Sequence, residues 1–304
     1  MPRVLVIGSA NVDYTVAVAR LPQPGETVSS GTLLVNHGGK GANQAVAARR
    51  LGADVRLIAL VGDDAAGRSI RAALADEGIG VAGVAVTDAA ATGTALIVVD
   101  AEGRNQIAVA PGANRLLTVE RVGSGAEDFA WADVLVCQLE TPLPTVRWAL
   151  DHVRRRRAIT ILNPAPVPDA PLDCWSLVDY LTPNEGEAQR LSGIPAAGAD
   201  GAVRAGEVLR GRGVGAVVVT RGVDGVLACA ADGVHRVPPV EVPAIDTTAA
   251  GDAFNGALAV ALGEGRALPA ALRFANAAAA LACTRRGAQP SLPTRSEVER
   301  LFGR

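Results

Sequence analysis

The segment from Asp246 to Gly256 has the residue types and spacing of an anion-binding site. Its pattern predicts an irregular loop that leads into a helix of small residues, and the N–H groups of a first helical turn can hold phosphate oxygens. Asp252 falls in this turn, where a carboxylate can accept the proton of an attacking alcohol while the amides stabilise charge on a moving phosphoryl group. Helix capping by Asp252, with the small residues serving close packing, is the alternative interpretation.

Two further clusters could hold a polyhydroxylated ligand. Residues 8–13 read Gly-Ser-Ala-Asn-Val-Asp, and residues 37–44 read His-Gly-Gly-Lys-Gly-Ala-Asn-Gln. Asn11, Asp13 and Asn43 supply hydrogen-bond donors and acceptors, and the glycines let a ring lie against the backbone. Helix capping is again the alternative. Neither cluster matches a Walker A loop or the dinucleotide fingerprint, so a nicotinamide-dependent dehydrogenase is set aside.

Three more polar segments follow apolar runs, namely Gln138–Glu140, Asn184–Glu187 and Thr220–Gly225. A polar loop after a strand is common in α/β proteins, so each segment alone is weak evidence of a site. Their repeated occurrence at the same kind of position favours a ligand-binding edge of a sheet.

The elements that must position these residues alternate between strands and helices. Apolar runs predict strands buried on both faces at residues 4–7, 55–61, 134–137, 159–162 and 216–220. Helical patterns cover residues 42–51, 65–77, 144–157, 250–262, 268–283 and 294–302. Gly52 and Gly78 stand just past two of these helices, where a left-handed residue is favoured. The alternation predicts an α/β fold with a parallel sheet.

Two stretches show strand-like alternation instead. Residues 14–36 surround a turn-prone Pro-Gly segment, and residues 94–110 surround the hairpin signal Asp100–Gly103. We expect them to form a small sheet, called the lid below, over the C-terminal ends of the main strands, where open α/β folds bind ligands. No repeat or interdomain linker is evident, so residues 1–304 are expected to form a single domain that carries this lid.

The composition excludes several classes of protein. The 29 basic and 31 acidic side chains give a formal net charge of −2, without the excess positive charge that nucleic-acid binding needs. The four cysteines lack disulfide-framework or zinc-ligand spacing, so we expect a reducing cytoplasmic location. No apolar run approaches the roughly 18 residues of a membrane span, so no membrane partner is expected. Lys40 is the only lysine, and it lies in a glycine cluster.

These motifs resemble those of the PfkB family of carbohydrate kinases, and within it the ribokinase group. Residues 38–45, Gly-Gly-Lys-Gly-Ala-Asn-Gln-Ala, resemble the N-terminal signature, and residues 246–252, Asp-Thr-Thr-Ala-Ala-Gly-Asp, resemble the C-terminal one. Segments 138–140, 182–185 and 286–290 are also similar, in the same order, so the resemblance covers nearly the whole chain. It implies a ribokinase-like three-layer α/β/α fold with a mostly parallel central sheet and a small β-sheet lid.

The resemblance also implies roles for individual residues. Asp252 would be the catalytic base, and the amides of Ala249, Ala250, Gly251 and Asp252 would form an anion hole. The sugar would be bound by Asn11, Val12, Asp13, Gly39, Lys40, Gly41, Ala42, Asn43, Glu140 and Asp252. ATP would be bound by Asn184, Thr220, Arg221, Gly222, Val223, Asp224, Gly225, Gly251, Asp252 and Asn276. Glu187 would help to order Mg²⁺ through water, and K⁺ would be held, mostly by backbone carbonyls, at Asp246, Thr248, Ala282, Arg285, Gly287 and Ser291.

The activity implied by the resemblance is ATP-dependent phosphorylation of D-ribose at its 5-hydroxyl. A PfkB kinase for another sugar or nucleoside, such as deoxyribose, fructose or pseudouridine, is the alternative, although Asp13 and Asn43 favour a ribose-like ligand. A non-catalytic sugar-binding regulator is disfavoured because Asp252 and its loop are intact. A lid would exclude water from the reaction and limit ATP hydrolysis. In ribokinase-like kinases the lids pair between two subunits, so the resemblance implies a homodimer whose contact covers exposed sheet edges.

Overall fold

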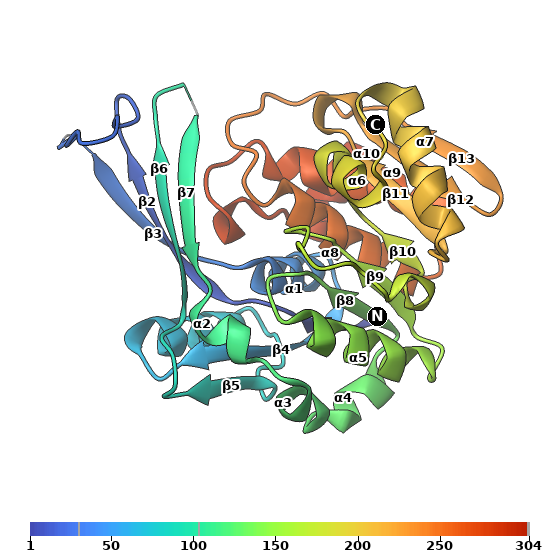
Figure 1. The fold of residues 1–304 in the computed structure, drawn as a ribbon, viewed down its shortest axis with the longest axis horizontal. Coiled ribbons are helices and arrows are strands. Elements are labelled where there is room, and N and C mark those ends of the chain that lie inside the picture. The colour runs from blue at the N-terminus through green and yellow to red at the C-terminus, as the bar shows by residue number, and fades with distance from the viewer. Residues whose placement is uncertain (30, 103, 303–304) are drawn as a thin grey trace.

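A large sheet lies between two layers of helices, with a smaller sheet beside it, in the computed structural model, which describes residues 1–29, 31–102 and 104–302 (Figure 1). The nine strands of the large sheet have the order β13-β12-β11-β10-β9-β8-β1-β4-β5. Their bounds are Arg3–Ile7 (β1), Asp54–Gly62 (β4), Val84–Thr87 (β5), Val134–Cys137 (β8), Ile159–Leu162 (β9), Tyr180–Leu181 (β10), Ala216–Thr220 (β11), Val226–Ala230 (β12) and Gly233–Val237 (β13). The strands from β5 to β11 pair in parallel, and β12 and β13 extend one edge in antiparallel pairing. The predicted α/β class with a mostly parallel sheet is confirmed.

Helices cover both faces of this sheet. One layer comprises α1 (Lys40–Arg50), α2 (Ala65–Asp76), α8 (Ala250–Gly263), α9 (Leu268–Ala282) and α10 (Arg295–Phe302). The other comprises α3 (Val119–Gly123), α4 (Ala126–Trp131), α5 (Leu143–Arg154), α6 (Glu185–Ser192) and α7 (Gly198–Gly211). Successive β1 residues alternate between the layers, since Val4 and Val6 pack in the first and Leu5 and Ile7 in the second. Because both faces are covered, the strand is a continuous apolar run.

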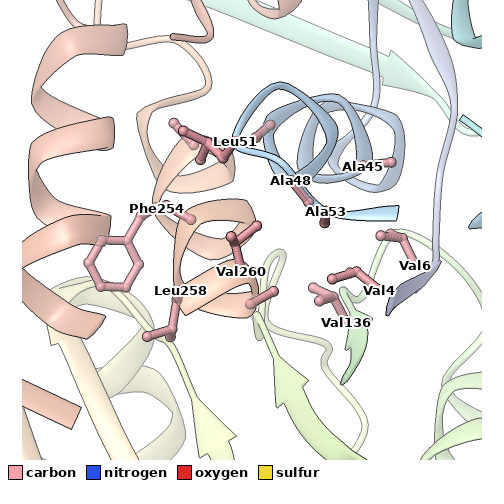
Figure 2. Packing of buried hydrophobic residues seen from close by; sticks show 14 of the residues in the cluster. Val4, Val6, Ala45, Ala48, Leu51, Ala53, Val136, Phe254, Leu258 and Val260 are labelled. Atoms are coloured by element: carbon pink, nitrogen blue, oxygen red, sulfur yellow. The ribbon is translucent and has the colours of Figure 1, made fainter. Parts of the chain in front are cut away.

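Close packing of α1 against α8 brings the beginnings of two helices together. Figure 2 shows Ala45 and Ala48 of α1 above β1 and beside α8. A Cβ at Gly256 of α8 would stand only 2.6 Å from the Cβ of Ala47, so any larger residue would push the helices apart. The small residues of both motifs therefore set the distance between the segments around Lys40 and Asp252.

The lid is a four-stranded sheet with the order β3-β2-β6-β7, and it stands at one side of the main body (Figure 1). Its strands are Asn11–Ala17 (β2), Thr32–Gly38 (β3), Gly93–Val99 (β6) and Asn105–Ala110 (β7). The small sheet expected from residues 14–36 and 94–110 is thus present. Its first strand begins at Asn11, so Asn11 and Asp13 are themselves lid residues.

The five predicted strands of the main sheet all form, and one helix is shorter than its pattern suggested. The helix expected over residues 144–157 ends at Arg154, and residues 155–157 form a turn that closes with Arg157 at a φ of 63°. Arg157 therefore occupies the left-handed position after the helix, where glycine is the usual residue. Gly103 of the predicted hairpin turn lies outside the described residues. None of the described helices is long and apolar enough to span a bilayer.

Candidate active site

The candidate site lies at the C-terminal ends of β1, β8 and β9. In the order of the large sheet, β1 stands between β4 and β8, and the chain builds the sheet outward on both sides of it. Open α/β sheets bind ligands at such a switch in strand order, because the loops after the two neighbouring strands diverge and leave a crevice. Residues 8–13, 138–140 and 163 follow these strands, as the sequence pattern predicted for the first two segments.

The start of α8 presents backbone amides that could bind an anion. Ala249 precedes the helix in a left-handed conformation, with a φ of 60° and no side-chain cap. The Ala250 amide donates to the Thr247 carbonyl at 3.2 Å. Within the described residues the amides of Gly251 and Asp252 have no hydrogen-bond acceptor outside the helix, so they are available to an anion.

Asp252 is held by two side chains of α1. Its Oδ2 accepts a hydrogen bond of 2.9 Å from Asn43 Nδ2, and its Oδ1 accepts one of 2.9 Å from Gln44 Nε2. The side chain does not cap its own helix, so the capping interpretation is wrong. Burial raises the pKa of Asp252 above its ordinary value, and the Lys40 charge and the two amide donors partly oppose this rise. A carboxylate with a raised pKa and a fixed orientation suits a general base.

A second set of buried amides supports this arrangement from behind. Gln138 Nε2 donates to Gln44 Oε1 at 2.6 Å, which fixes the Gln44 amide with its NH₂ group toward Asp252. Asn255 Nδ2 donates to the Gly251 carbonyl at 2.8 Å, and Asn255 Oδ1 accepts from Thr182 Oγ1 at 2.7 Å. These contacts hold both the Asp252 carboxylate and the backbone of the first α8 turn before any ligand arrives.

The only lysine lies in the same pocket, a cavity of about 230 Å³ that Lys40, Asp252 and Glu187 help to line. Although burial opposes it, the carboxylates of Asp252, Glu140 and Glu187 raise the pKa of Lys40. The ammonium is therefore charged, and Gly251 at the start of α8 lines the same cavity. A site with one lysine and free amides can neutralise a phosphoryl group without a basic surface.

Glu187 is the carboxylate that the family resemblance assigns to Mg²⁺. Its Oε2 accepts from the Asn184 amide at 2.9 Å in the capping box of α6, and burial raises its pKa. The described residues contain no group of three metal-ligating side chains. Mg²⁺ in nucleotide enzymes commonly takes one or two carboxylates together with phosphates and water, so this donor set fits such an ion.

A larger cavity of about 620 Å³ separates the lid from the main body. Asp13 and Asn36 face it from the lid, and Asp246 and Thr248 face it from the loop before α8. Burial, with the nearby charges of Glu140 and Asp252, raises the pKa of Asp13 to about 6. The acidic side chain is thus placed where a hydroxyl-rich ligand could donate to it.

Glycines and Glu140 hold the loops at this end of the sheet close together. A Cβ at Gly41 would lie 2.6 Å from the Gly8 carbonyl carbon, and Gly39 has a φ of 87°, so neither position accepts a side chain without strain. Glu140 Oε2 accepts from the Lys40 amide at 3.1 Å and from the Ser9 hydroxyl. Asn43 Oδ1 is buried without a hydrogen-bond partner among the described residues, as expected of an acceptor kept for a ligand.

The residues expected around ATP fall into two groups. Asn184 and Thr220 line the smaller cavity and are joined by an isolated β-bridge. The following loop, residues 221–225, is shaped by Gly222 and Gly225 at positive φ. Asn276 on α9 is outside the lining of this cavity, and its Nδ2 donates to the Pro238 carbonyl at 2.9 Å.

A family model for the pfkB family carbohydrate kinases matches residues 1–295. The chain belongs to the PfkB family of carbohydrate kinases. It is 40% identical to the ribokinase of Haemophilus influenzae over 293 residues, which cover 96% of each chain. It is 34% identical to the deoxyribokinase of Salmonella typhi over 96% of this chain and 95% of that protein. The structure of Arabidopsis thaliana ribokinase complexed with ribose and ATP matches with a TM-score of 0.91 and 32% identity, covering 99% of this chain and 98% of that one.

In this PfkB chain the residues expected around a monovalent cation come from the loop before α8, from Ala282 at the end of α9 and from the segment that follows α9, and Asp246 joins the first to the last. Its Oδ1 accepts from the Thr248 amide at 2.9 Å and its Oδ2 from the Gly287 amide at 2.8 Å. These bonds bring segment 246–248 beside segment 285–291, which includes the buried Ser291. The available donors are a carboxylate, a hydroxyl and backbone carbonyls, and this oxygen chemistry fits a hard monovalent cation.

Several residues of this PfkB site were absent from the set expected from sequence. Gln44 lies directly after Asn43, and both reach Asp252 from adjacent positions of α1, although the sequence pattern marks Gln44 only as part of a motif. Asn163 accepts a hydrogen bond from Gln44 and Asn255 accepts one from Thr182, and both donors lie far away in sequence. The signal in the sequence that could have identified Asn163 and Asn255 as site residues is a polar side chain within an otherwise apolar stretch.

Proposed function

We propose that this protein transfers the γ-phosphoryl group of ATP to the 5-hydroxyl of D-ribose, giving D-ribose 5-phosphate and ADP. The observation that carries the proposal is Asp252, a buried carboxylate held by Asn43 and Gln44 beside the open amides of α8. The identity of 40% to a ribokinase over nearly the whole chain supports ribose as the acceptor.

The chemistry assigned to this chain is proton removal and charge stabilisation. Asp252 accepts the proton of the sugar hydroxyl as its oxygen bonds to the γ-phosphorus, while the bond to the bridging oxygen breaks and ADP leaves. The free amides of Gly251 and Asp252 and the Lys40 ammonium stabilise the negative charge on the transferred group. Mg²⁺ would neutralise the phosphates of bound ATP, with Glu187 holding it through water.

The sugar would bind between the lid and the main body. Asp13 would accept from sugar hydroxyls, and the buried Asn43 Oδ1 would accept from another. Deoxyribose is the competing acceptor, because the chain is also 34% identical to a deoxyribokinase. A site that hydrogen-bonds a hydroxyl discriminates strongly against the analogue that lacks it, so the two sugars are separable by kinetics.

Three further features belong to this proposal. A monovalent cation, K⁺, would bind by Asp246 and stabilise the loop before α8. The outer face of the lid would pair with a second copy of the chain, because it exposes apolar residues of three strands, among them Tyr14, Val35 and Leu96. The reaction would take place in the cytoplasm, where ATP is supplied.

The experiment that tests the proposal is ADP release by the purified protein with ATP and Mg²⁺. Ribose, deoxyribose, fructose and several nucleosides serve as acceptors, each with and without K⁺. We expect the highest kcat/KM with ribose and a gain on adding K⁺. Turnover with another acceptor alone would reassign the sugar site, and ribose binding without turnover with any acceptor would indicate a regulator.

A further inference from the structure

Asn114 joins the chain segments that enter and leave the lid. It lies in a 3₁₀ helix, Gly112–Leu116, directly after β7, and it is only 2% exposed. Its Oδ1 accepts from the Ala10 amide at 3.0 Å, while its Nδ2 donates to the Pro111 carbonyl at 3.0 Å and to Asn11 Oδ1 at 2.7 Å. A weaker contact of 3.5 Å runs from Nδ2 to the Ala10 carbonyl.

These contacts fix the direction of two side-chain amides. The Ala10 N–H can only donate and the Pro111 carbonyl can only accept, so the Asn114 oxygen and nitrogen cannot exchange places. The nitrogen therefore faces Asn11, and Asn11 must turn its oxygen toward it. The NH₂ group of Asn11 is left over, and it makes no hydrogen bond among the described residues.

The neighbouring strand leaves room for this contact. Gly93 is the partner of Asn11 in the β2–β6 register. A Cβ at Gly93 would lie 2.2 Å from Asn11 Oδ1 and 2.3 Å from Asn114 Nδ2, on top of the hydrogen bond itself. Any residue larger than glycine at this position would displace one of the two amides.

Asn11 shares its face of β2 with Asp13 and Thr15, which line the cavity under the lid. Asp13 can offer an ionised oxygen to a ligand, whereas Asn11 in this orientation can offer only N–H groups. A donor and an acceptor two residues apart on one strand complement a sugar hydroxyl pair, in which one oxygen accepts and the next hydroxyl donates.

We propose that Asn114 is a positioning residue that holds Asn11 with its NH₂ group toward the sugar, so that Asn11 acts as a donor to a sugar oxygen. The inference rests on the proposed function, since it takes Asn11 as a sugar ligand. Asn114 acts through Asn11, with its contact to Ala10 serving to fix its own orientation, and it need not touch the sugar itself.

The test compares ribose and ATP kinetics of Asn114→Ala, Asn114→Asp, Gly93→Ala and Asn11→Ala with those of the wild type. Asn114→Asp keeps an acceptor for the Ala10 amide but removes the donor to Asn11, whose amide would then turn its nitrogen away from the sugar. We expect all four variants to raise the KM for ribose by about tenfold, or about 1.4 kcal/mol, with little change in the KM for ATP. Ribose binding measured by calorimetry should weaken by a similar factor.

Thr145→Val is the matched control. Thr145 is buried, and its Oγ1 donates to the carbonyl of Leu117, beside the same 3₁₀ helix but away from the lid. This variant loses one buried hydrogen bond, so its Tm should fall while its KM for ribose stays at the wild-type value. It separates a general loss of stability from a loss of Asn11 orientation.

A double variant decides between positioning and independent effects. Asn11→Ala combined with Asn114→Ala should bind ribose as Asn11→Ala does, within about twofold, because Asn114 has nothing left to orient. The inference would be overturned if the losses in ribose binding of the two single variants multiplied in the double variant. It would also be overturned if Asn114→Asp bound ribose nearly as well as the wild type. If the wild type phosphorylates ribose and Asn11→Ala binds ribose unchanged, the inference is wrong but the proposed function stands. If the wild type is inactive on every sugar, both the proposed function and the inference are wrong.

Discussion

Asp252 lies on the floor of the site, which is formed by the starts of α1 and α8, and Asp13 lies on the lid. Both are acidic side chains with a raised pKa, but their surroundings differ. Asp252 accepts hydrogen bonds from Asn43 and Gln44, which are anchored in α1. Asp13 accepts none from the described part of the chain, and Glu140 and Asp252 add their repulsion to its burial.

The difference separates a group that the fold has organised in advance from one that needs a ligand. The floor is built on two helices packed on the main sheet, so its electrostatics are set before substrate binds. The lid is a separate sheet whose inner face borders a cavity. We therefore expect changes on the floor to affect kcat and changes on the lid to affect sugar binding.

The largest effect is expected from Asp252→Asn. The variant keeps the side-chain shape but loses the proton acceptor, so kcat should fall by about 10²- to 10⁴-fold. Ribose binding, measured by calorimetry, should persist because the lid is untouched. Near-normal turnover would show that another group removes the proton. It would also contradict the expectation that changes on the floor affect kcat.

Gln44→Leu should have the next largest effect. It removes one donor to Asp252, and since hydrogen bonds to the carboxylate lower its pKa, that pKa should rise further. A hydrogen bond to a charged group contributes about 1.5–3 kcal/mol, so the acidic limb of the kcat/KM profile should move about one pH unit upward. Gln138→Leu, which only loosens Gln44, should move the limb less and in the same direction. An unshifted limb in both variants would contradict the assignment of Asp252 as the base.

Asp13→Asn should weaken sugar binding while stabilising the protein. The pKa of Asp13 rises from 3.8 to about 6 on folding, so the folded state retains a proton between these values and stability falls as pH rises through this window. The variant removes this loss, so at about pH 8 its Tm should exceed that of the wild type by about 2 °C or more. At about pH 4 the two Tm values should converge. Calorimetry should show weaker ribose binding by the variant, and a lower Tm at high pH would contradict the idea that Asp13 is destabilising without ligand.

Leu96→Glu should have the smallest effect on catalysis and a clear effect on assembly. Leu96 is 57% exposed on the outer lid face, and a charge there should oppose pairing of two lids. Sedimentation should show monomers, with a modest rise in the KM for ribose and little change in kcat. Val109→Glu is the control, because Val109 is 52% exposed but lies on the face of the sheet that carries Asp13. Equal dissociation by both variants would contradict pairing through the outer face.

Local patterns were sufficient to predict many elements of this protein. The apolar run from Val4 to Ile7 predicted a strand covered on both faces, and glycine after a helical pattern predicted where α1 and α2 end. The segment before Asp252 predicted a helix start able to hold an anion, since the small residues and the loop lie within a few positions. Such features depend on backbone geometry and on periodicity, both of which are properties of neighbouring residues.

The tertiary structure alone decided which polar groups meet. Asp252 is held by side chains more than 200 positions away, and Gln44 reaches it because α1 and α8 pack closely enough at Gly256. Asn114 likewise faces Asn11 only because the chain returns to the base of the lid after β7. The sequence by itself determined the elements and the chemical types of the site residues. Their partners, and therefore their pKa shifts and orientations, depend on packing between distant segments, which no local pattern contains.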